Sequence, residues 1–236
     1  MKNKVVTGLM GLMLAGSALA QESGSQWSGE AELGIVATSG NTETQTVSAK
    51  AKVVNERDKW KHVAKFEALN TEDGTTTTAE RYLLSGKSDY KMSALDYVFI
   101  TANYEDDRFS GYDWRASELL GYGRHVIAQE DLSLDLEAGV GVRQSKTDAG
   151  VSDSEGIVSL AGNLGWKISD TSKFTEELNT EIGDSATISK SVTGLKTQIN
   201  GSLAMKITYT VKHTSKVPAG IEKVDRETAV TLVYSF

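Results

Sequence analysis

Residues 132–144 read LSLDLEAGVGVRQ, and this stretch decides the fold class. Leucine, alanine and valine occupy every even-numbered position from 132 to 142, whereas the odd-numbered positions hold serine, aspartate, glutamate, glycine and arginine. Alternation with a period of two is typical of a β-strand with one apolar and one polar face. A helix with this sequence would scatter its charges around the whole circumference. Residues 156–169, GIVSLAGNLGWKIS, alternate in the same way, so both segments are interpreted as strands.

The same period continues along most of the chain, and no segment favours a helix longer than a turn or two. We therefore predict about twelve strands. They lie near residues 27–38, 44–55, 59–70, 78–91, 96–105, 113–126, 131–145, 156–169, 172–183, 191–203, 206–215 and 225–236.

The connections between these strands carry a second pattern. Those after even-numbered strands are short, as in NERDK, KMSALD, IAQED, SDTS and AMK. Those after odd-numbered strands are mostly longer and more polar, as in TEDGTTTT, EDDRFSGYD, SKTDAGVSDSE, GDSATISKSV and KVPAGIEKV. An even number of antiparallel strands with alternating short and long connections indicates a single up-and-down transmembrane β-barrel, with both termini on the periplasmic side.

Aromatic residues support a membrane barrel because many lie near the predicted strand ends. Trp and Tyr at such positions form the interfacial girdles of outer-membrane barrels. The residues concerned are Trp27, Trp60, Tyr90, Tyr97, Tyr104, Trp114, Trp166, Phe174, Tyr234 and Phe236.

The N-terminal segment, MKNKVVTGLMGLMLAGSALA, predicts export. Two lysines precede an apolar stretch that is too short to span a bilayer, and Ala18-Leu19-Ala20 forms a small-x-small cleavage site. We expect a signal peptide at residues 1–20 and one barrel domain at residues 21–236. Removing two of the 25 basic residues leaves 23 against 32 acidic ones, and the resulting net charge of -9 argues against nucleic acid as a partner. The chain has no cysteine, hence no disulfide framework or thiolate site.

The C-terminal segment, TAVTLVYSF at residues 228–236, ends on an apolar strand face that requires lipid rather than water. A closing strand with a terminal aromatic resembles the signal read by the barrel-insertion machinery of Gram-negative bacteria. The expected assembly signal consists of Val230, Leu232, Tyr234 and Phe236.

Four stretches together resemble a bacterial family of salt-induced outer-membrane proteins, a domain family of unknown function. They are SGNTET at 39–44, DWRASELLGYGR at 113–124, LEAGVGVR at 136–143 and the closing residues 216–236, KVPAGIEKVDRETAVTLVYSF. The resemblance implies an outer-membrane β-barrel and carries no established activity or catalytic residues. Any role in salt or osmotic stress is implied by the family name alone.

Three histidines, His62, His125 and His213, are the candidates for chemistry. None can be assigned an acidic partner from spacing, and no two have the spacing of metal ligands, so we predict no catalytic, metal-binding or cofactor-binding residues. The glycines of GYG (121–123) and GVG (139–141) lie inside strands, where they let the sheet bend and leave room in a narrow barrel. The acidic runs at 71–73, 105–107 and 152–155 are interpreted as solvated loops.

The polar face of the strands should line the barrel lumen with charges of both signs. Charges inside a barrel must be hydrated or paired, so this set fits either a salt-bridged plug or a narrow water-filled pore. The predicted lumen-facing residues are Glu30, Glu32, Lys50, Lys52, Lys65, Glu67, Asp135, Glu137, Arg143 and Lys167.

Three functional hypotheses remain at this point. The first is a non-enzymatic outer-membrane barrel that acts as a narrow channel or envelope component, in contact with outer-membrane lipid and lipopolysaccharide. The second is an outer-membrane enzyme that modifies lipid or lipopolysaccharide. The third is a soluble periplasmic binding barrel, which would turn its apolar strand faces inward.

Overall fold

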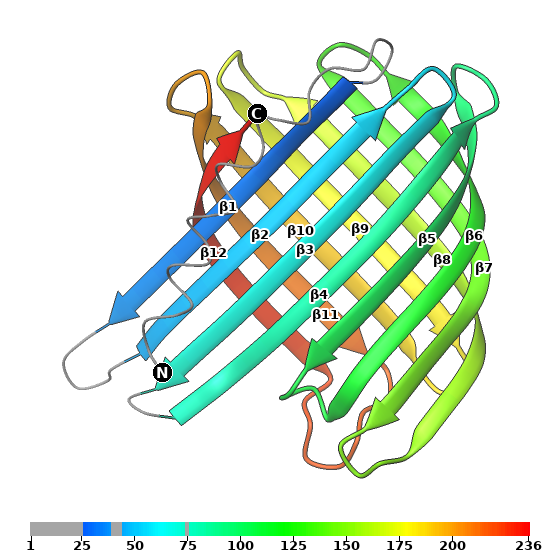
Figure 1. Cartoon of the computed structure of the whole chain (residues 1–236), viewed down its shortest axis with the longest axis vertical. Coiled ribbons are helices and arrows are strands. Elements are labelled where there is room, and N and C mark those ends of the chain that lie inside the picture. Colours follow the sequence, from blue (N-terminus) through cyan, green and yellow to red (C-terminus); the bar gives the residue numbers. More distant parts are fainter. Residues whose placement is uncertain (1–25, 39–43, 74–75) are drawn as a thin grey trace.

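Twelve antiparallel strands close into one barrel, in which each strand pairs with its neighbours in sequence and β1 pairs with β12 (Figure 1). A computed structural model describes residues 26–38, 44–73 and 76–236; the predicted signal peptide at 1–20 lies outside these ranges. The described part of the chain contains no helix long and apolar enough to cross a membrane. The strands are β1 (Gln26–Thr38), β2 (Thr44–Glu56), β3 (Trp60–Asp73), β4 (Thr76–Lys91), β5 (Asp96–Asp107), β6 (Tyr112–Ala128), β7 (Leu132–Thr147), β8 (Ser152–Lys167), β9 (Ser172–Gly183), β10 (Thr187–Gln198), β11 (Leu203–Thr214) and β12 (Val224–Ser235).

Connections are short at both ends of the barrel, which corrects the predicted alternation. At the end that carries Gln26 and Phe236, here called the terminal end, the turns cover residues 57–59, 92–95, 129–131, 168–171 and 199–202. At the opposite end, here called the far end, residues 108–111, 148–151 and 184–186 make equally short turns, and only 215–223 is long among the described connections. The polar segments expected to be long loops are instead extensions of the strands, because the ladder of backbone hydrogen bonds continues through them.

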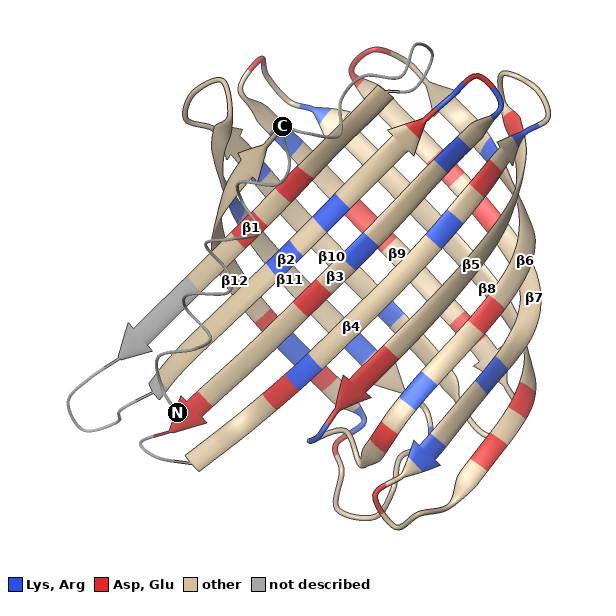
Figure 2. Cartoon of the chain, viewed as in Figure 1, with Lys and Arg blue, Asp and Glu red and all other residues tan. Residues whose placement is uncertain are grey.

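The two faces of the strands divide as the alternation predicts. On β7, Val140 is 62% exposed on the outer surface, and Leu136 and Val142 are also exposed there. Glu137 and Arg143 of the same strand face the interior. Charged residues recur along the strands (Figure 2). Many of them line the interior. An apolar outer surface around a charged interior is the arrangement of a transmembrane barrel, and it contradicts the soluble alternative with inward apolar faces.

Near the terminal end, two aromatic side chains point into the barrel interior instead of toward the outer surface. Tyr97 and Phe99 are buried on the inner face of β5, opposite Gly123 and Gly121 of β6. A Cβ atom added to Gly121 would lie 2.4 Å from the Phe99 ring, and one added to Gly123 would lie 2.3 Å from the Tyr97 ring. The glycines therefore make room for these rings, and the prediction that Tyr97 belongs to the outer girdle is wrong.

Strand β10 is displaced from its predicted range, 191–203, to Thr187–Gln198. The turn that follows covers 199–202, where Asn200 Oδ1 accepts hydrogen bonds from the amides of Ser202 and Leu203 at 3.1 and 3.0 Å. Sequence reasoning missed this Asn-Gly turn. It also interpreted the start of β10 as a loop, because the outward residues of this strand are hydroxylic: Ser191 and Thr193 both donate to Glu176 at 2.6 Å.

The C-terminal residue closes the barrel. The register of β1 against β12 runs from Glu30–Ser235 to Leu33–Leu232. Beyond it, Gly29 and Phe236 exchange two backbone hydrogen bonds of 2.9 and 3.0 Å, and the Phe236 ring lies over Gly29. The four residues of the predicted assembly signal are all exposed on the outer surface: Val230, Leu232, Tyr234 and Phe236.

Candidate functional site: the charged lumen

The barrel encloses a cavity of about 520 Å³ whose wall is dominated by charged and polar side chains. Every strand except β12 contributes to the lining. Twelve lining residues are basic and seven are acidic. The basic residues are Lys50, Lys52, Lys65, Arg81, Lys87, Arg115, Arg143, Lys173, Lys190, Lys196, Lys206 and Lys212, and the acidic ones are Glu30, Glu32, Glu67, Glu105, Glu137, Glu177 and Glu181.

Most of the predicted lumen-facing charges lie in this wall. The residues that line the cavity are Glu30, Glu32, Lys50, Lys52, Lys65, Glu67, Glu137 and Arg143. The other two, Asp135 and Lys167, are absent from the lining and lie toward the terminal end of β7 and β8. Asp135 Oδ1 lies 2.6 Å from Nδ1 of His125, and the Lys167 ammonium lies 3.1 Å from Asp170 in the adjoining turn.

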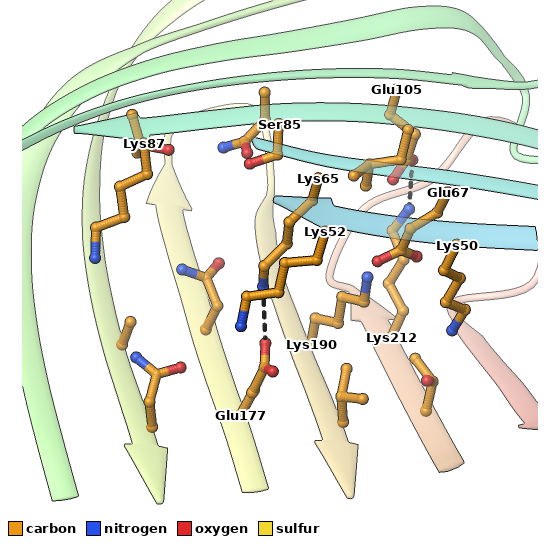
Figure 3. Close-up of a pocket in the computed structure, with 18 of the residues that line it drawn as sticks. Lys50, Lys52, Lys65, Glu67, Ser85, Lys87, Glu105, Glu177, Lys190 and Lys212 are labelled. Carbon is orange, nitrogen blue, oxygen red and sulfur yellow. Dashed lines mark hydrogen bonds and ion pairs between the residues drawn. The ribbon is translucent and has the colours of Figure 1, made fainter. Parts of the chain in front are cut away.

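One ion pair crosses the lumen near the middle of the strands. Lys65 on β3 donates to Glu177 on β9 at 3.3 Å, and these strands stand six positions apart in the ring of twelve (Figure 3). The two side chains are 37% and 49% exposed. Because water reaches both groups, the Coulomb attraction between them is strongly reduced.

A second ion pair crosses the lumen toward the far end, between Lys212 on β11 and Glu105 on β5, at 2.5 Å. Arg115 on β6 binds the same carboxylate at 2.7 Å, and it lies directly opposite Glu105 in the strand register. The side chains of Lys212, Glu105 and Arg115 are only 10%, 17% and 10% exposed. This triad, here called the far-end clamp, holds two cations against one buried carboxylate.

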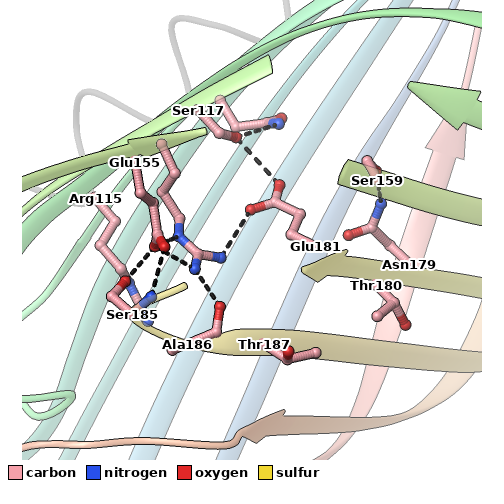
Figure 4. Close-up of polar contacts among 12 residues, drawn as sticks. Arg115, Ser117, Glu155, Ser159, Asn179, Thr180, Glu181, Ser185, Ala186 and Thr187 are labelled. Carbon is pink, nitrogen blue, oxygen red and sulfur yellow. Dashed lines mark hydrogen bonds and ion pairs between the residues drawn. The ribbon is translucent and has the colours of Figure 1, made fainter. Parts of the chain in front are cut away.

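Two of the acidic runs predicted to be solvated loops instead contribute carboxylates to ion pairs. Glu105 belongs to the far-end clamp. Glu155 binds the guanidinium of Arg143 at 2.6 Å, and Glu181 contacts the same guanidinium at 3.4 Å. Figure 4 shows how Glu155 and Glu181 lie in this network. Arg143 also donates to the carbonyl of Ala186. Glu105 and Glu155 thus lie on strands β5 and β8 instead of in loops, so both are within reach of the lumen.

A third cluster lies toward the terminal end, where Glu137 accepts hydrogen bonds from Lys87 and, at 2.6 Å, from the hydroxyl of Tyr97. The Lys87 ammonium lies 4.7 Å from the centre of the Phe99 ring, in range of a cation–π contact. The inward aromatic rings thus support the polar network instead of forming an apolar core.

Three lining lysines remain without an ion pair within 4.0 Å among the described residues: Lys52, Lys173 and Lys190. In contrast, Lys196 and Lys206 bind Glu30 and Glu32 at 2.6 and 2.8 Å. Lys52 extends from β2 beside Lys65, and Lys190 extends from the opposite wall (Figure 3). Of the seven lining carboxylates, only Glu67 lacks such an ion pair among the described residues, so unpaired lysines outnumber unpaired carboxylates by three to one.

Some lumen residues that sequence reasoning missed were within its reach. Arg81, Ser85 and Lys87 share one parity in β4, so extending the inward face of that strand would have found them. Lys190 was hidden by the misplaced start of β10. The contacts across the lumen had no sequence signal, because they depend on the stagger of the strands around the barrel.

The histidines do not gather into a site. His62 Nδ1 lies 2.9 Å from the Ser88 hydroxyl, and His125 pairs with Asp135. The residues that the structure describes contain no cluster of three or more His, Asp or Glu side chains arranged to hold a metal ion.

Residues 31–236 match the family described as "Protein of unknown function, DUF481". The chain belongs to this family. A curated relative, the "Uncharacterized protein YdiY" of Escherichia coli (strain K12), is 29% identical over 213 residues, which cover 88% of this chain and 82% of the relative.

Solved structures of outer-membrane proteins share the fold. The NanC porin superposes with a TM-score of 0.52 at 11% identity, covering 89% of this chain and 98% of the porin chain. An outer-membrane channel from Pseudomonas putida F1 also superposes with a TM-score of 0.52 at 11% identity, covering 92% and 97% of the two chains. At such low identity these similarities establish the barrel fold of an outer-membrane protein and no more.

Proposed function

We propose that this protein is a non-enzymatic, narrow diffusion channel of the bacterial outer membrane. The observation that carries the proposal is the middle of the lumen, where the wall is charged and solvent-accessible instead of packed. A cavity of about 520 Å³ lies inside, and the ion pair that crosses its middle is 37% and 49% exposed. Because the Lys65 and Glu177 side chains are solvent-accessible, small polar solutes can pass them without breaking a buried contact.

The width of the channel is set by long side chains. Lys65 and Glu177 meet from opposite walls, and the far-end clamp meets in the same way. Rings of charged side chains of this kind determine which solutes pass through a pore. We therefore expect small conductance, suited to small polar solutes.

The experiment is a planar lipid bilayer recording with purified, refolded protein. Discrete current steps in KCl are expected, and the protein's folded state is checked by its heat-dependent shift on an electrophoresis gel. Folded protein that enters the bilayer and never conducts would contradict the proposal. A boiled sample of the same preparation is the control for contaminating channels.

We also propose that assembly uses the barrel-insertion machinery, which would read the outward face of β12. Phe236→Asp should lower the fraction of heat-modifiable protein in outer membranes, whereas Phe236→Tyr should be mild because the ring over Gly29 is kept. Both variants retain the two backbone hydrogen bonds to Gly29. Equal insertion of Phe236→Asp and the parent would contradict this role.

We further propose that the protein contacts outer-membrane lipid and lipopolysaccharide, and that it has a role in salt or osmotic stress. The stress link rests on the family resemblance alone. A deletion strain should grow more slowly than its parent after a rise in salt concentration, and restoring the gene should reverse the effect. Unchanged growth over a range of salt concentrations would remove this part of the proposal.

A further inference from the structure

Two lysines lie side by side on the lumen wall. Lys52 on β2 and Lys65 on β3 are direct partners in the antiparallel register, and both line the cavity. Like charges placed directly opposite each other destabilise a sheet. Their placement opposite each other therefore costs stability.

Two carboxylates lie beside this pair. Glu30 on β1 is the direct register partner of Lys52, but its carboxylate binds Lys196 at 2.6 Å. Glu177 lies 3.3 Å from Lys65, and Lys52 has no ion pair within 4.0 Å in the described part of the chain. In the close-up, Lys52 and Lys65 extend in the same direction toward Glu177 (Figure 3). Among the described residues, Glu177 is thus the only carboxylate within 4.0 Å of either lysine, and Glu30 is shared with Lys196.

The carboxylate of Glu177 can also be replaced easily as the counter-ion of Lys65. Solvent-exposed ion pairs contribute little to stability, so an anion from solution can replace Glu177 beside Lys65 at little cost. The carboxylate of the far-end clamp differs because it is 17% exposed and held by two cations, which leaves it no freedom to exchange.

The surrounding field has the same sign. Twelve basic and seven acidic side chains line the cavity, and counting Asp89, Glu155 and Glu227, which pair with lining cations, brings the acidic number to ten. The lumen is therefore positive although the whole chain has a net charge of -7. This formal excess of two positive charges has the sign that raises the local concentration of anions.

We propose that Lys52 and Lys65, with Glu177 as their internal counter-ion, form an anion-selecting site in the middle of the lumen. The site takes small solutes that carry carboxylate or similar oxyanion groups, which replace Glu177 as the partner of the lysines and are released on the other side. This inference rests on the proposed channel function and names its class of solute.

The test is the reversal potential of single channels under a KCl gradient. The parent should favour chloride over potassium. Lys52→Gln should shift the reversal potential toward equal permeability, and it breaks no ion pair, whereas Lys52→Arg should preserve selectivity. Glu177→Gln should shift the potential in the opposite direction, toward still greater anion preference.

Lys167→Gln is the matched control, because it removes the same charge from a lysine outside the cavity lining and should leave the reversal potential unchanged. Citrate serves as the carboxylate probe, and it should reduce the KCl current of the parent more strongly than that of Lys52→Gln. Conducting channels without anion preference, unaltered selectivity in both Lys52→Gln and Glu177→Gln, or no block by citrate would overturn the inference while the channel function stands. Absence of any current would instead remove the channel function on which it rests.

Discussion

Two ion pairs cross the same lumen between opposite walls, yet their surroundings differ. Lys65 and Glu177 join β3 to β9 in water, whereas Lys212 and Glu105 join β11 to β5 with side chains that are mostly buried. The far-end pair also includes Arg115, so one carboxylate binds two cations. The comparison teaches that a bridge across the lumen can be either a structural clamp or an exchangeable counter-ion, and that burial decides which.

The largest expected effect comes from breaking the far-end clamp. Glu105→Gln leaves Arg115 and Lys212 close together without their carboxylate, and removing one partner of a buried ion pair typically costs about 3–5 kcal/mol. The free energy of unfolding, measured by denaturant titration in lipid vesicles, should fall by that order. A loss no larger than that of Glu177→Gln would show that the two bridges are equivalent.

A somewhat smaller effect is expected from placing a charge on the outer face of β7, which the account assigns to lipid. Val140 is 62% exposed on the outer face of β7. Val140→Arg should destabilise the inserted barrel by about 2–4 kcal/mol if the residue lies near the bilayer midplane. Val140→Leu is the control and should be nearly neutral in the same titration. An arginine that is tolerated as well as leucine would contradict the assignment of this face to lipid.

The exposed bridge should contribute little to stability. Glu177→Gln is expected to change the free energy of unfolding by less than about 1 kcal/mol, as for other solvent-exposed ion pairs. A double-mutant cycle with Lys65→Gln measures the coupling directly, and this coupling should shrink further in high salt. A coupling energy of several kcal/mol would show that Lys65 and Glu177 form a structural clamp like the far-end clamp, and would contradict their assignment as an exchangeable pair.

The strands could be predicted wherever one face is apolar. On β7 and β8 the alternation located the strands and gave the correct outward face, because lipid demands an apolar residue at every second position. On β10 the outward positions include Ser191 and Thr193, so the two faces look alike and the strand was misplaced. The pattern fails where the outer surface itself is polar.

The candidate site was only partly accessible to sequence reasoning. Local parity identified Lys52, Lys65 and Glu137 as lumen residues, because parity depends on neighbours within one strand. It gave no indication that Lys65 meets Glu177, which lies 112 residues later in the chain. Glu105 was interpreted as part of a loop, because the length of a strand beyond the bilayer leaves no apolar signal.

Accessibility of Lys65 to water-borne reagents during conduction tests the central claim most directly. The natural chain has no cysteine, so Lys65→Cys offers one unique thiol in the lumen. A bulky, water-soluble methanethiosulfonate reagent added to conducting channels should reduce the current in discrete steps, and Val140→Cys, on the outer face, should be unaffected. Current that continues unchanged after verified modification of residue 65 would show that ions do not pass between Lys65 and Glu177, and would contradict the account of the lumen as the conducting path.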